Sequence, residues 1–226
     1  MKNNATEIVY ILDRSGSMRG LEADTIGGFN SMMNKQKETG ENAIVTTVLF
    51  DDAYEVLHDR VSLESVGEMT EKQYYVRGCT ALLDAVGETI HHIVAIHKST
   101  PKEELPKKTI FIITTDGMEN ASVKYSYDKV KKMVKKQQNK RGWEFVFIGA
   151  NIDSYAESEK LGVKKNRTVN YVHDEVGTKK VYAGVTHMLC NAMRADDDCE
   201  YTCLDTSNWA NGIKDDFKQR GRRSCT

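Results

Sequence analysis

Short apolar segments of strand length alternate with longer segments of helical periodicity along most of the chain. Such alternation is typical of a mainly parallel sheet with helices on both faces, so the chain is predicted to be an α/β protein. The strand-like segments span residues 7–12, 43–50, 54–59, 109–115, 144–148 and 167–171. Apolar residues recur at helical spacing in residues 21–38, 82–97, 126–140, 154–161 and 176–193.

The connections between these segments predict the order of the strands. The acidic turn Asp51-Asp52 joins two strand-like segments directly, which indicates an antiparallel hairpin at one edge of the sheet. The remaining strands are separated by helices, as right-handed crossovers require. We therefore predict a Rossmann-like, doubly wound α/β fold with a mainly parallel six-stranded sheet of order 3-2-1-4-5-6 and one antiparallel edge strand.

The alternation also suggests how the chain is divided. Residues 1–194 are predicted to form one domain, and residues 195–226, where the rhythm is lost, to form an irregular or partly helical tail. Residues 62–76 are expected to hold only one or two helical turns. Gly27-Gly28 would weaken the helix at 21–38 unless the backbone there packs closely against a neighbour.

Polar side chains follow the first strand directly, in the sequence IVYILDRSGSM of residues 8–18. Asp13, Ser15 and Ser17 alternate along the chain, so in an extended loop their side chains can turn toward one point. Open α/β sheets bind ligands at the carboxyl ends of their strands. A divalent-ion site is one interpretation of this pattern, and a helix N-cap is the other.

Two further polar residues lie at comparable places. Asp116 follows the strand at 109–115, and Thr80 comes after a glycine turn and before the helix at 82–97. The winding of the predicted sheet reverses between the strands that end at Asp13 and Asp116, which places a ligand crevice there. The set offers only oxygen atoms, which suit Mg²⁺, or Mn²⁺ or Ca²⁺, better than zinc.

With these five residues in view, the chain resembles the von Willebrand factor A (VWA) domain. The metal-ion-dependent adhesion site of that family is a DxSxS–T–D set, which corresponds here to Asp13, Ser15, Ser17, Thr80 and Asp116. The resemblance implies that the three hydroxyls contact the ion, directly or through water. It also implies that the two aspartates supply charge, one or both of them through bridging waters.

The resemblance extends over about residues 5–193 and implies a function. Several segments are similar to bacterial and phage-type stand-alone, intracellular A domains: IGGFNSMMNKQK, GCTALLDAVGETI, TTDGMENAS and GWEFVFIGANID. The family's ligand-binding mode implies an adaptor module that captures a Glu or Asp carboxylate of a partner protein at an open position on the ion. Members of this branch look like adaptors for ATPase machines or for stress and defence operons, so the expected partner is a protein of that kind.

A metal-dependent hydrolase of phosphoesters or peptides is the alternative, because a Lewis-acid ion can activate water. Hydrolysis would also need a general base. His91 and His92 are the nearest imidazoles in the sequence, but they lie roughly 15 Å along the expected helix. An aspartyl-nucleophile phosphatase would have an acid in place of Ser15, and no GxGxxG or P-loop pattern follows the first strand. We therefore expect that the chain is not an enzyme.

Residues adjacent to the motif are expected on the rim of the site. Arg14 would cover the open position or pair with a partner's acid. Asp84 would orient a metal-bound water or a loop hydroxyl, or simply occupy the first turn of a helix, where acids are favourable. Glu119 and Asn120 would shape the choice of partner. The four rim candidates besides Asn120 are Arg14, Asp84, Gly117 and Glu119.

Three features outside the motif carry weaker signals. Asn151 and Asp153 are expected to cap a helix rather than to bind the ion. In residues 129–141, lysines alternate with apolar residues at helical spacing, so a solvated helix face is expected rather than a nucleic-acid site. Cys199 and Cys203 have a C-x₃-C spacing, but no second pair or histidine follows them to complete a zinc site.

Composition limits the remaining possibilities. The 226 residues suit one domain, and a net charge of −1 gives no electrostatic argument for nucleic acid or a membrane as partner. No apolar run reaches the roughly 18 residues of a membrane span, and the first residues lack the apolar segment of a signal peptide. The 5 scattered cysteines indicate reduced thiols and a cytoplasmic location, with Cys79 expected to be small and buried.

Overall fold

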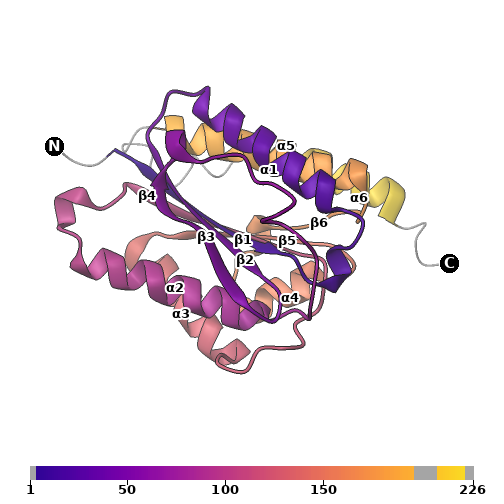
Figure 1. Ribbon diagram of the computed structural model, residues 1–226. Helices are drawn as coiled ribbons and strands as arrows, with labels where there is room; N and C mark the ends of the chain where they lie inside the picture. The colour runs from indigo at the N-terminus through magenta and orange to yellow at the C-terminus, as the bar shows by residue number, and fades with distance from the viewer. Residues whose placement is uncertain (1–3, 196–207, 222–226) are drawn as a thin grey trace.

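One six-stranded sheet, in the order β3-β2-β1-β4-β5-β6, organises the computed structural model, which describes residues 4–195 and 208–221 (Figure 1). Strand β1 pairs in parallel with β2 and β4, and β4-β5 and β5-β6 are also parallel. The pair β2-β3 is antiparallel. The predicted fold class and strand order are therefore confirmed. The strands are Thr6–Asp13 (β1), Ala43–Phe50 (β2), Tyr54–Ser62 (β3), Lys108–Thr115 (β4), Glu144–Gly149 (β5) and Thr168–Asn170 (β6).

Helices cover both faces of the sheet, as Figure 1 shows. Helices α1, α5 and α6 lie on one face and α2, α3 and α4 on the other, and each face has its own cluster of buried apolar side chains. The α-helices are Glu22–Lys37 (α1), Leu82–Ser99 (α2), Tyr127–Arg141 (α3), Ser154–Leu161 (α4), Glu175–Arg194 (α5) and Asn211–Arg220 (α6). Short 3₁₀ helices span Gly16–Met18, Leu63–Ser65, Lys102–Glu104 and Lys165–Arg167.

The expected segments are all present, with small differences at their ends. Strand β3 is longer than expected because its pairing with β2 continues to Ser62, which lies opposite Ile44. After α5, helix α6 packs against the same core through Ile213, and Trp209 in the turn before α6 joins it. The boundary expected at residues 194–195 stays a prediction, and Cys199 and Cys203 lie outside the described residues.

The two glycines inside α1 differ in their surroundings. A Cβ at Gly28 would lie 2.2 Å from Cδ2 of Tyr182 on α5, whereas a Cβ at Gly27 would have no heavy atom within 4 Å. Gly28 therefore permits the close contact between α1 and α5, and Gly27 does not. The close packing that was predicted for Gly27-Gly28 therefore occurs at Gly28, between α1 and α5.

We expect the variant Gly28→Ala to lower the free energy of unfolding by about 1–3 kcal/mol, because the new methyl group displaces the ring of Tyr182. The matched variant Gly27→Ala should raise it by up to about 1 kcal/mol through helix propensity. Urea unfolding followed by circular dichroism measures both. Equal effects of the two substitutions would contradict the packing argument.

Candidate metal centre

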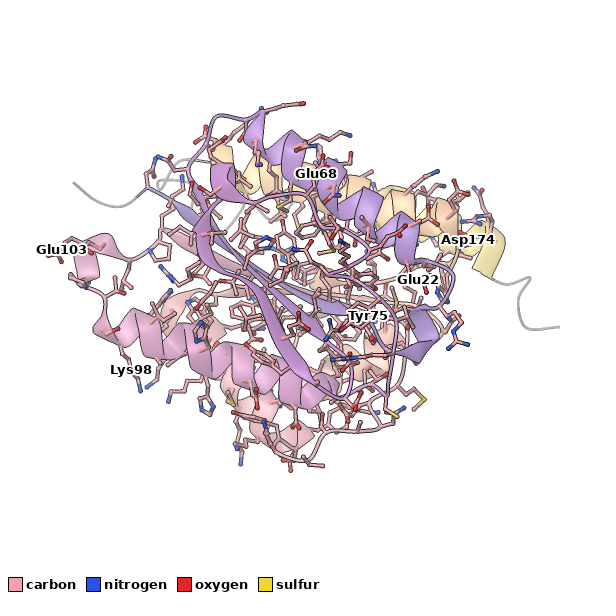
Figure 2. The ribbon with its side chains drawn as sticks, viewed as in Figure 1. Glu22, Glu68, Tyr75, Lys98, Glu103 and Asp174 are labelled. Atoms are coloured by element: carbon pink, nitrogen blue, oxygen red, sulfur yellow. The ribbon has the colours of Figure 1, made fainter. Side chains whose placement is uncertain are left out.

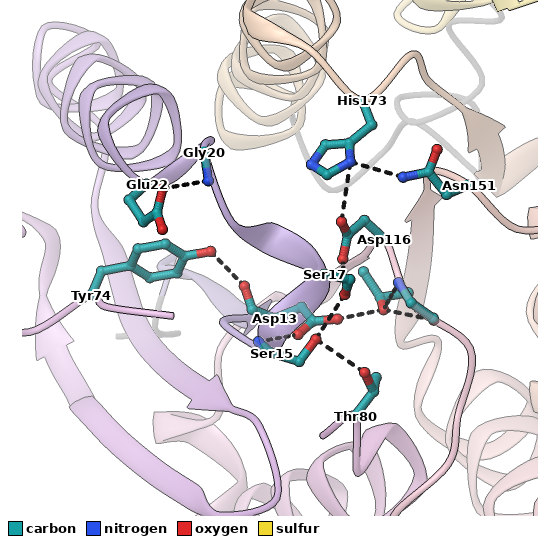
Figure 3. Close-up of polar contacts among 12 residues, drawn as sticks. Asp13, Ser15, Ser17, Gly20, Glu22, Tyr74, Thr80, Asp116, Asn151 and His173 are labelled. Carbon is teal, nitrogen blue, oxygen red and sulfur yellow. Dashed lines mark hydrogen bonds and ion pairs between the residues drawn. The ribbon is translucent and has the colours of Figure 1, made fainter. Parts of the chain in front are cut away.

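The five motif side chains come together beyond the carboxyl ends of β1 and β4 (Figure 3). The Oγ atom of Ser15 lies 3.0 Å from Ser17 Oγ and 3.0 Å from Thr80 Oγ1. Ser17 in turn donates a hydrogen bond of 2.5 Å to Oδ1 of Asp116. The carboxylate of Asp13 accepts from the backbone N–H of Ser15 at 2.7 Å. Residues that are 103 positions apart in the sequence, Asp13 and Asp116, thus belong to one polar cluster.

Parallel pairing and close backbone contacts produce this convergence. Because β1 and β4 are neighbours with parallel register, the residues that follow them emerge at the same edge of the sheet. The backbone N–H of Gly16 donates to the carbonyl of Gly78 at 3.1 Å, which holds the loop before Thr80 against the first loop. Neither Ser15 nor Leu21, the residues that precede the first two helical segments, makes a side-chain cap bond. The helix-cap interpretation of the motif is therefore wrong.

The donor set fits a divalent cation. Asp13, Ser15, Thr80 and Asp116 are buried, whereas Ser17 is exposed, so the cluster opens to solvent on one side. The Oδ2 atom of Asp116 is buried and accepts no hydrogen bond. Buried oxygens that are bonded mainly to one another are suited to hard cations such as Mg²⁺, Mn²⁺ and Ca²⁺.

Gly117 lies closer to the cluster than its expected place on the rim. A Cβ on this residue would lie 2.8 Å from Thr80 Oγ1 and 3.0 Å from Ser17 Oγ. Any side chain here would therefore press on the two hydroxyls. The absence of a side chain keeps the space beside them clear.

Both carboxylates are poised for a positive partner. Burial raises the pKa of Asp13 to about 6, although hydrogen bonds from Thr115 and Ser15 oppose the shift. Burial also raises the pKa of Asp116, and the Ser17 hydroxyl and His173 oppose that shift. Each ionised carboxylate is thus less stable here than in water, and a bound cation would relieve this.

This shift predicts how metal binding depends on pH. A carboxyl with a raised pKa keeps its proton more firmly in the folded chain, so protons compete with the ion below about pH 6. Affinity for Mn²⁺ should fall about tenfold for each pH unit below that value, and change little above pH 7. Calorimetric titration at several pH values measures this. An affinity that is constant between pH 5 and pH 7 would contradict it.

Arg14 does not take the expected place over the site. Its side chain is fully buried, with Nε 2.9 Å from Asp51 Oδ2 and Nη2 2.7 Å from Glu55 Oε2. The same Asp51 oxygen lies 2.7 Å from Nε of Arg77. The expectation that Arg14 covers the site or meets a partner's acid is corrected: Arg14 ties the first loop to the β2-β3 turn.

Asp84 and Glu119 hold the loop after Asp116 rather than an ion or a partner. The carboxylate of Asp84 accepts the backbone N–H groups of residues 123–125, each at 2.9 Å. Glu119 accepts the backbone N–H groups of Leu83, Ala121 and Ser122, and also the Ser122 hydroxyl. Since both carboxylates are used in this way, the expected roles in water orientation and partner choice are not seen.

Asn120 also joins this loop to the site, and Asp153 acts as expected. The side-chain oxygen of Asn120 accepts from Thr80 N at 2.9 Å, and Asn120 N donates to Thr80 O at 3.0 Å. Asp153 caps α4 by accepting from Tyr155 N and Ala156 N. Asn151 does not act as a cap, because its side chain faces His173 instead.

His173, in the loop between β6 and α5, is a residue of the site that the sequence did not indicate. Its Nδ1 atom lies 3.3 Å from Asp116 Oδ2 and 2.8 Å from Asn151 Nδ2, as Figure 3 shows. The Nε2 atom is buried and has no hydrogen-bond partner. His91 and His92, by contrast, pair with Tyr125 and Asp59. The sequence around His173 shows only a polar loop before a helix, and it does not indicate contact with the residue that follows β4.

We expect His173→Ala to weaken Mn²⁺ binding about tenfold, because Asp116 Oδ2, which accepts no hydrogen bond, loses the imidazole that lies 3.3 Å away and limits its movement. His173→Asn should restore most of the affinity, since its amide nitrogen can occupy the place of Nδ1. Isothermal titration calorimetry measures both variants, with urea unfolding as a check on the fold. Equal losses in the two variants would show that His173 acts only through packing.

The predictions for the lysine-rich helix, for Cys79 and for membrane spans can also be compared with the structure. In residues 129–141 the cationic side chains are exposed or half-buried and Val130 and Val134 are buried, which confirms the solvated face. Cys79 is exposed, contrary to expectation, and follows the left-handed turn at Gly78. No helix in the part of the chain that the structure describes is long and apolar enough to cross a membrane.

Comparison with known proteins supports the fold through structure alone. No family model and no curated protein matches the sequence. Similar solved structures include a von Willebrand factor type A protein from Catenulispora acidiphila (TM-score 0.57, 14% identity, 84% of this chain and 43% of that one). Another is proximal thread matrix protein 1 from the mussel byssus, with a zinc-occupied MIDAS (metal-ion-dependent adhesion site) motif. It has a TM-score of 0.55 at 16% identity over 84% of this chain and 46% of that one.

A third neighbour is the manganese-loaded TRAP protein of Plasmodium vivax, with a TM-score of 0.53 at 17% identity over 79% of this chain and 73% of that one. The chain spans less than half the length of the first two proteins. At these identities the similarity concerns the fold. The chain has the Rossmann-like fold of the von Willebrand factor A domains.

Proposed function

We propose that this chain is a divalent-cation-dependent protein-interaction module. Asp13, Ser15, Ser17, Thr80 and Asp116 would hold the ion. When bound, the ion would supply an electrophilic position that accepts a Glu or Asp carboxylate of a partner protein. The observation that carries this proposal is the convergence of the oxygen atoms of these five side chains at one solvent-facing edge of the sheet.

The balance of charge supports capture rather than simple storage of an ion. Two carboxylates at most neutralise a divalent cation, and the remaining donors are neutral hydroxyls. The ion would therefore keep an affinity for one more anionic ligand. We propose Mg²⁺ as the ion, with Mn²⁺ or Ca²⁺ as alternatives. Two neighbours of the same fold are described with zinc or manganese.

We propose a cytoplasmic adaptor of bacterial or phage type, whose partner is an ATPase or a protein of a stress or defence operon. The free thiols of Cys79 and Cys190 agree with a reducing compartment. The sequence segments that resemble stand-alone A domains support the bacterial or phage type and the kind of partner.

His173 does not favour the hydrolase alternative, although it brings an imidazole to the site. A general base must reach the water that it deprotonates. Here Nδ1 faces Asp116 and Asn151, and Nε2 is buried. The imidazole is therefore placed to orient Asp116 rather than to take a proton from solvent.

A peptide array tests the proposal directly. The protein is labelled with a fluorophore and applied to an array of random peptides that carry Glu, Asp, Gln or Asn at one fixed position. The array is read once with Mn²⁺ and once with EDTA. We expect Mn²⁺-dependent binding to the Glu and Asp peptides only, and its loss in Asp116→Asn. Binding that ignores either the metal or the carboxylate would overturn the proposal. Metal-dependent turnover of p-nitrophenyl phosphate would support the hydrolase instead.

A further inference from the structure

Large apolar side chains are exposed at the same end of the sheet as the candidate ion site. In residues 4–195 and 208–221, the exposed large apolar residues are Val56, Tyr75, Met118, Val123 and Val176. Tyr75 belongs to the loop that leads to Thr80, and Met118 and Val123 to the loop that follows Asp116. Val123 is 89% exposed and Met118 is 66% exposed. Apolar exposure of this degree beside a polar site is typical of an interaction surface.

Met118 is close to the ion-binding atoms because of its neighbour. Gly117 lies against the hydroxyls of Thr80 and Ser17, so the next side chain emerges at the edge of the cluster. Met118 is therefore an exposed apolar side chain one residue from the cluster.

The loop that carries Met118 and Val123 is held rigidly, although it contains no helix or strand. Glu119 and Asp84 together accept six backbone N–H groups at one side of the site. The N–H of Val123 is itself one of these, at 2.9 Å from Asp84 Oδ2. The exposed side chains are thus presented in a fixed geometry. A surface that is already ordered loses little conformational entropy when it binds.

Tyr75 is fixed in a different way. The guanidinium carbons of Arg14 and Arg77 lie 5.2 Å and 5.4 Å from the centre of its ring. Arg14 is buried, so the ring rests on a stable base, and 42% of Tyr75 stays exposed. Figure 2 labels Tyr75 among the side chains. An aromatic ring held in this manner is a common anchor in protein interfaces.

From these observations we infer that Tyr75, Met118 and Val123 form an apolar rim that selects the partner. The inference rests on the proposed function. The occupant is a segment of another protein in which the captured Glu or Asp is flanked by apolar side chains. The carboxylate would complete the ion site, and the apolar neighbours would cover the rim. A cation that needs an anionic ligand, next to fixed apolar side chains, fits such a segment better than a purely acidic one.

The peptide array described above tests this inference with new variants. Met118→Ser/Val123→Ser removes two apolar side chains that are exposed, so the fold should not change. Val56→Ser is the matched control, because Val56 is exposed on β3 and lies outside the two site loops. The array is extended to peptides with Leu, Phe, Ser or Lys at the positions next to a fixed Glu. Calorimetry with Mn²⁺ alone is run on every variant.

We expect the parent chain and Val56→Ser to prefer Glu next to Leu or Phe by at least about tenfold over Glu next to Ser or Lys. The double variant should lose this preference and still bind Mn²⁺ with the parent's affinity. Mn²⁺-dependent binding of Glu peptides without any apolar preference would overturn the inference and leave the proposed function standing. Absence of all Mn²⁺-dependent carboxylate binding would overturn both.

Other occupants of the rim give different results. A second copy of the chain would produce a Mn²⁺-dependent dimer in light scattering, and the double variant would abolish it. A membrane would produce co-sedimentation with vesicles of phosphatidylcholine and phosphatidylserine, lost in the same variant. Either result, without selection among the peptides, would overturn the assignment to a partner segment.

Discussion

The variant Asp13→Asn should be more stable than the parent chain without metal at pH 7.5 and should bind Mg²⁺ or Mn²⁺ at least about tenfold more weakly. Burial raises the pKa of Asp13 to about 6, so at pH 7.5 the carboxylate is ionised in a place that disfavours charge. A rise from 3.8 to about 6 corresponds to about 3 kcal/mol. The neutral amide removes that penalty and with it the charge that would attract the ion.

The surroundings of Asp13 can accept an amide without a lost hydrogen bond. The amide oxygen can accept from Ser15 N, as Oδ1 does at 2.7 Å. The amide nitrogen can donate to Thr115 Oγ1, which now donates to Asp13 Oδ2 at 2.6 Å. The Thr115 proton can then turn to the carbonyl of Gly117, 3.1 Å away. The fold should therefore persist, and any loss of binding is attributable to the charge.

Thermal unfolding with and without Mn²⁺, together with calorimetry, measures both effects. Asp153→Asn is the matched control, because Asp153 caps α4 and an asparagine caps a helix equally well. The control should bind Mn²⁺ as the parent does. If Asp13→Asn binds as tightly as the parent, Asp13 does not serve the ion. If its metal-free form is less stable than the parent, the argument from burial is wrong.

The strand order and the five-residue cluster could be predicted because each depends on regularities of the sheet. Asp13 and Asp116 each follow an apolar run, and parallel neighbouring strands bring the residues that follow them to one edge. Thr80 could be added because it stands between a glycine turn and a helix. In each case the side chain is placed by the element beside it.

Residues whose role depends on contacts between distant loops could not be predicted. His173 reaches Asp116 only because β6 lies beyond β5 and the loop after it turns back over β4. Asn151 has a left-handed backbone, with φ of 55°. Asparagine tolerates this conformation better than most residues, but its presence does not reveal that the side chain will meet His173. Arg14 has a long side chain in a loop, and the sequence does not reveal whether it turns outward or toward Asp51. The acidic turn at residues 51–52 was the available clue.

The second large effect concerns Arg14. We expect Arg14→Ala to lower the free energy of unfolding by about 3–5 kcal/mol, because it leaves buried Asp51 without one of its two arginine partners and opens a large cavity. Arg77→Ala removes the other partner, but that side chain is 45% exposed. Its loss should reduce stability much less than the loss of Arg14, since water can replace an exposed guanidinium. Urea unfolding of the three proteins measures the difference, and equal losses would contradict the assigned burial.

Arg14 should also affect the ion site, since its backbone joins two of the loops. The carbonyl of Arg14 accepts from Arg77 N at 3.0 Å, and its side chain shares Asp51 with Arg77. If the ion pair between Arg14 and Asp51 is lost, the loop that carries Thr80 can move relative to the loop that carries Ser15 and Ser17. Arg14→Met/Asp51→Asn removes the charges on both sides, so it should recover about 1–3 kcal/mol relative to the sum of the single variants. Mn²⁺ affinity that stays low in this double variant, despite the recovered stability, would show that the ion pair aligns the two loops and does more than hold the fold together.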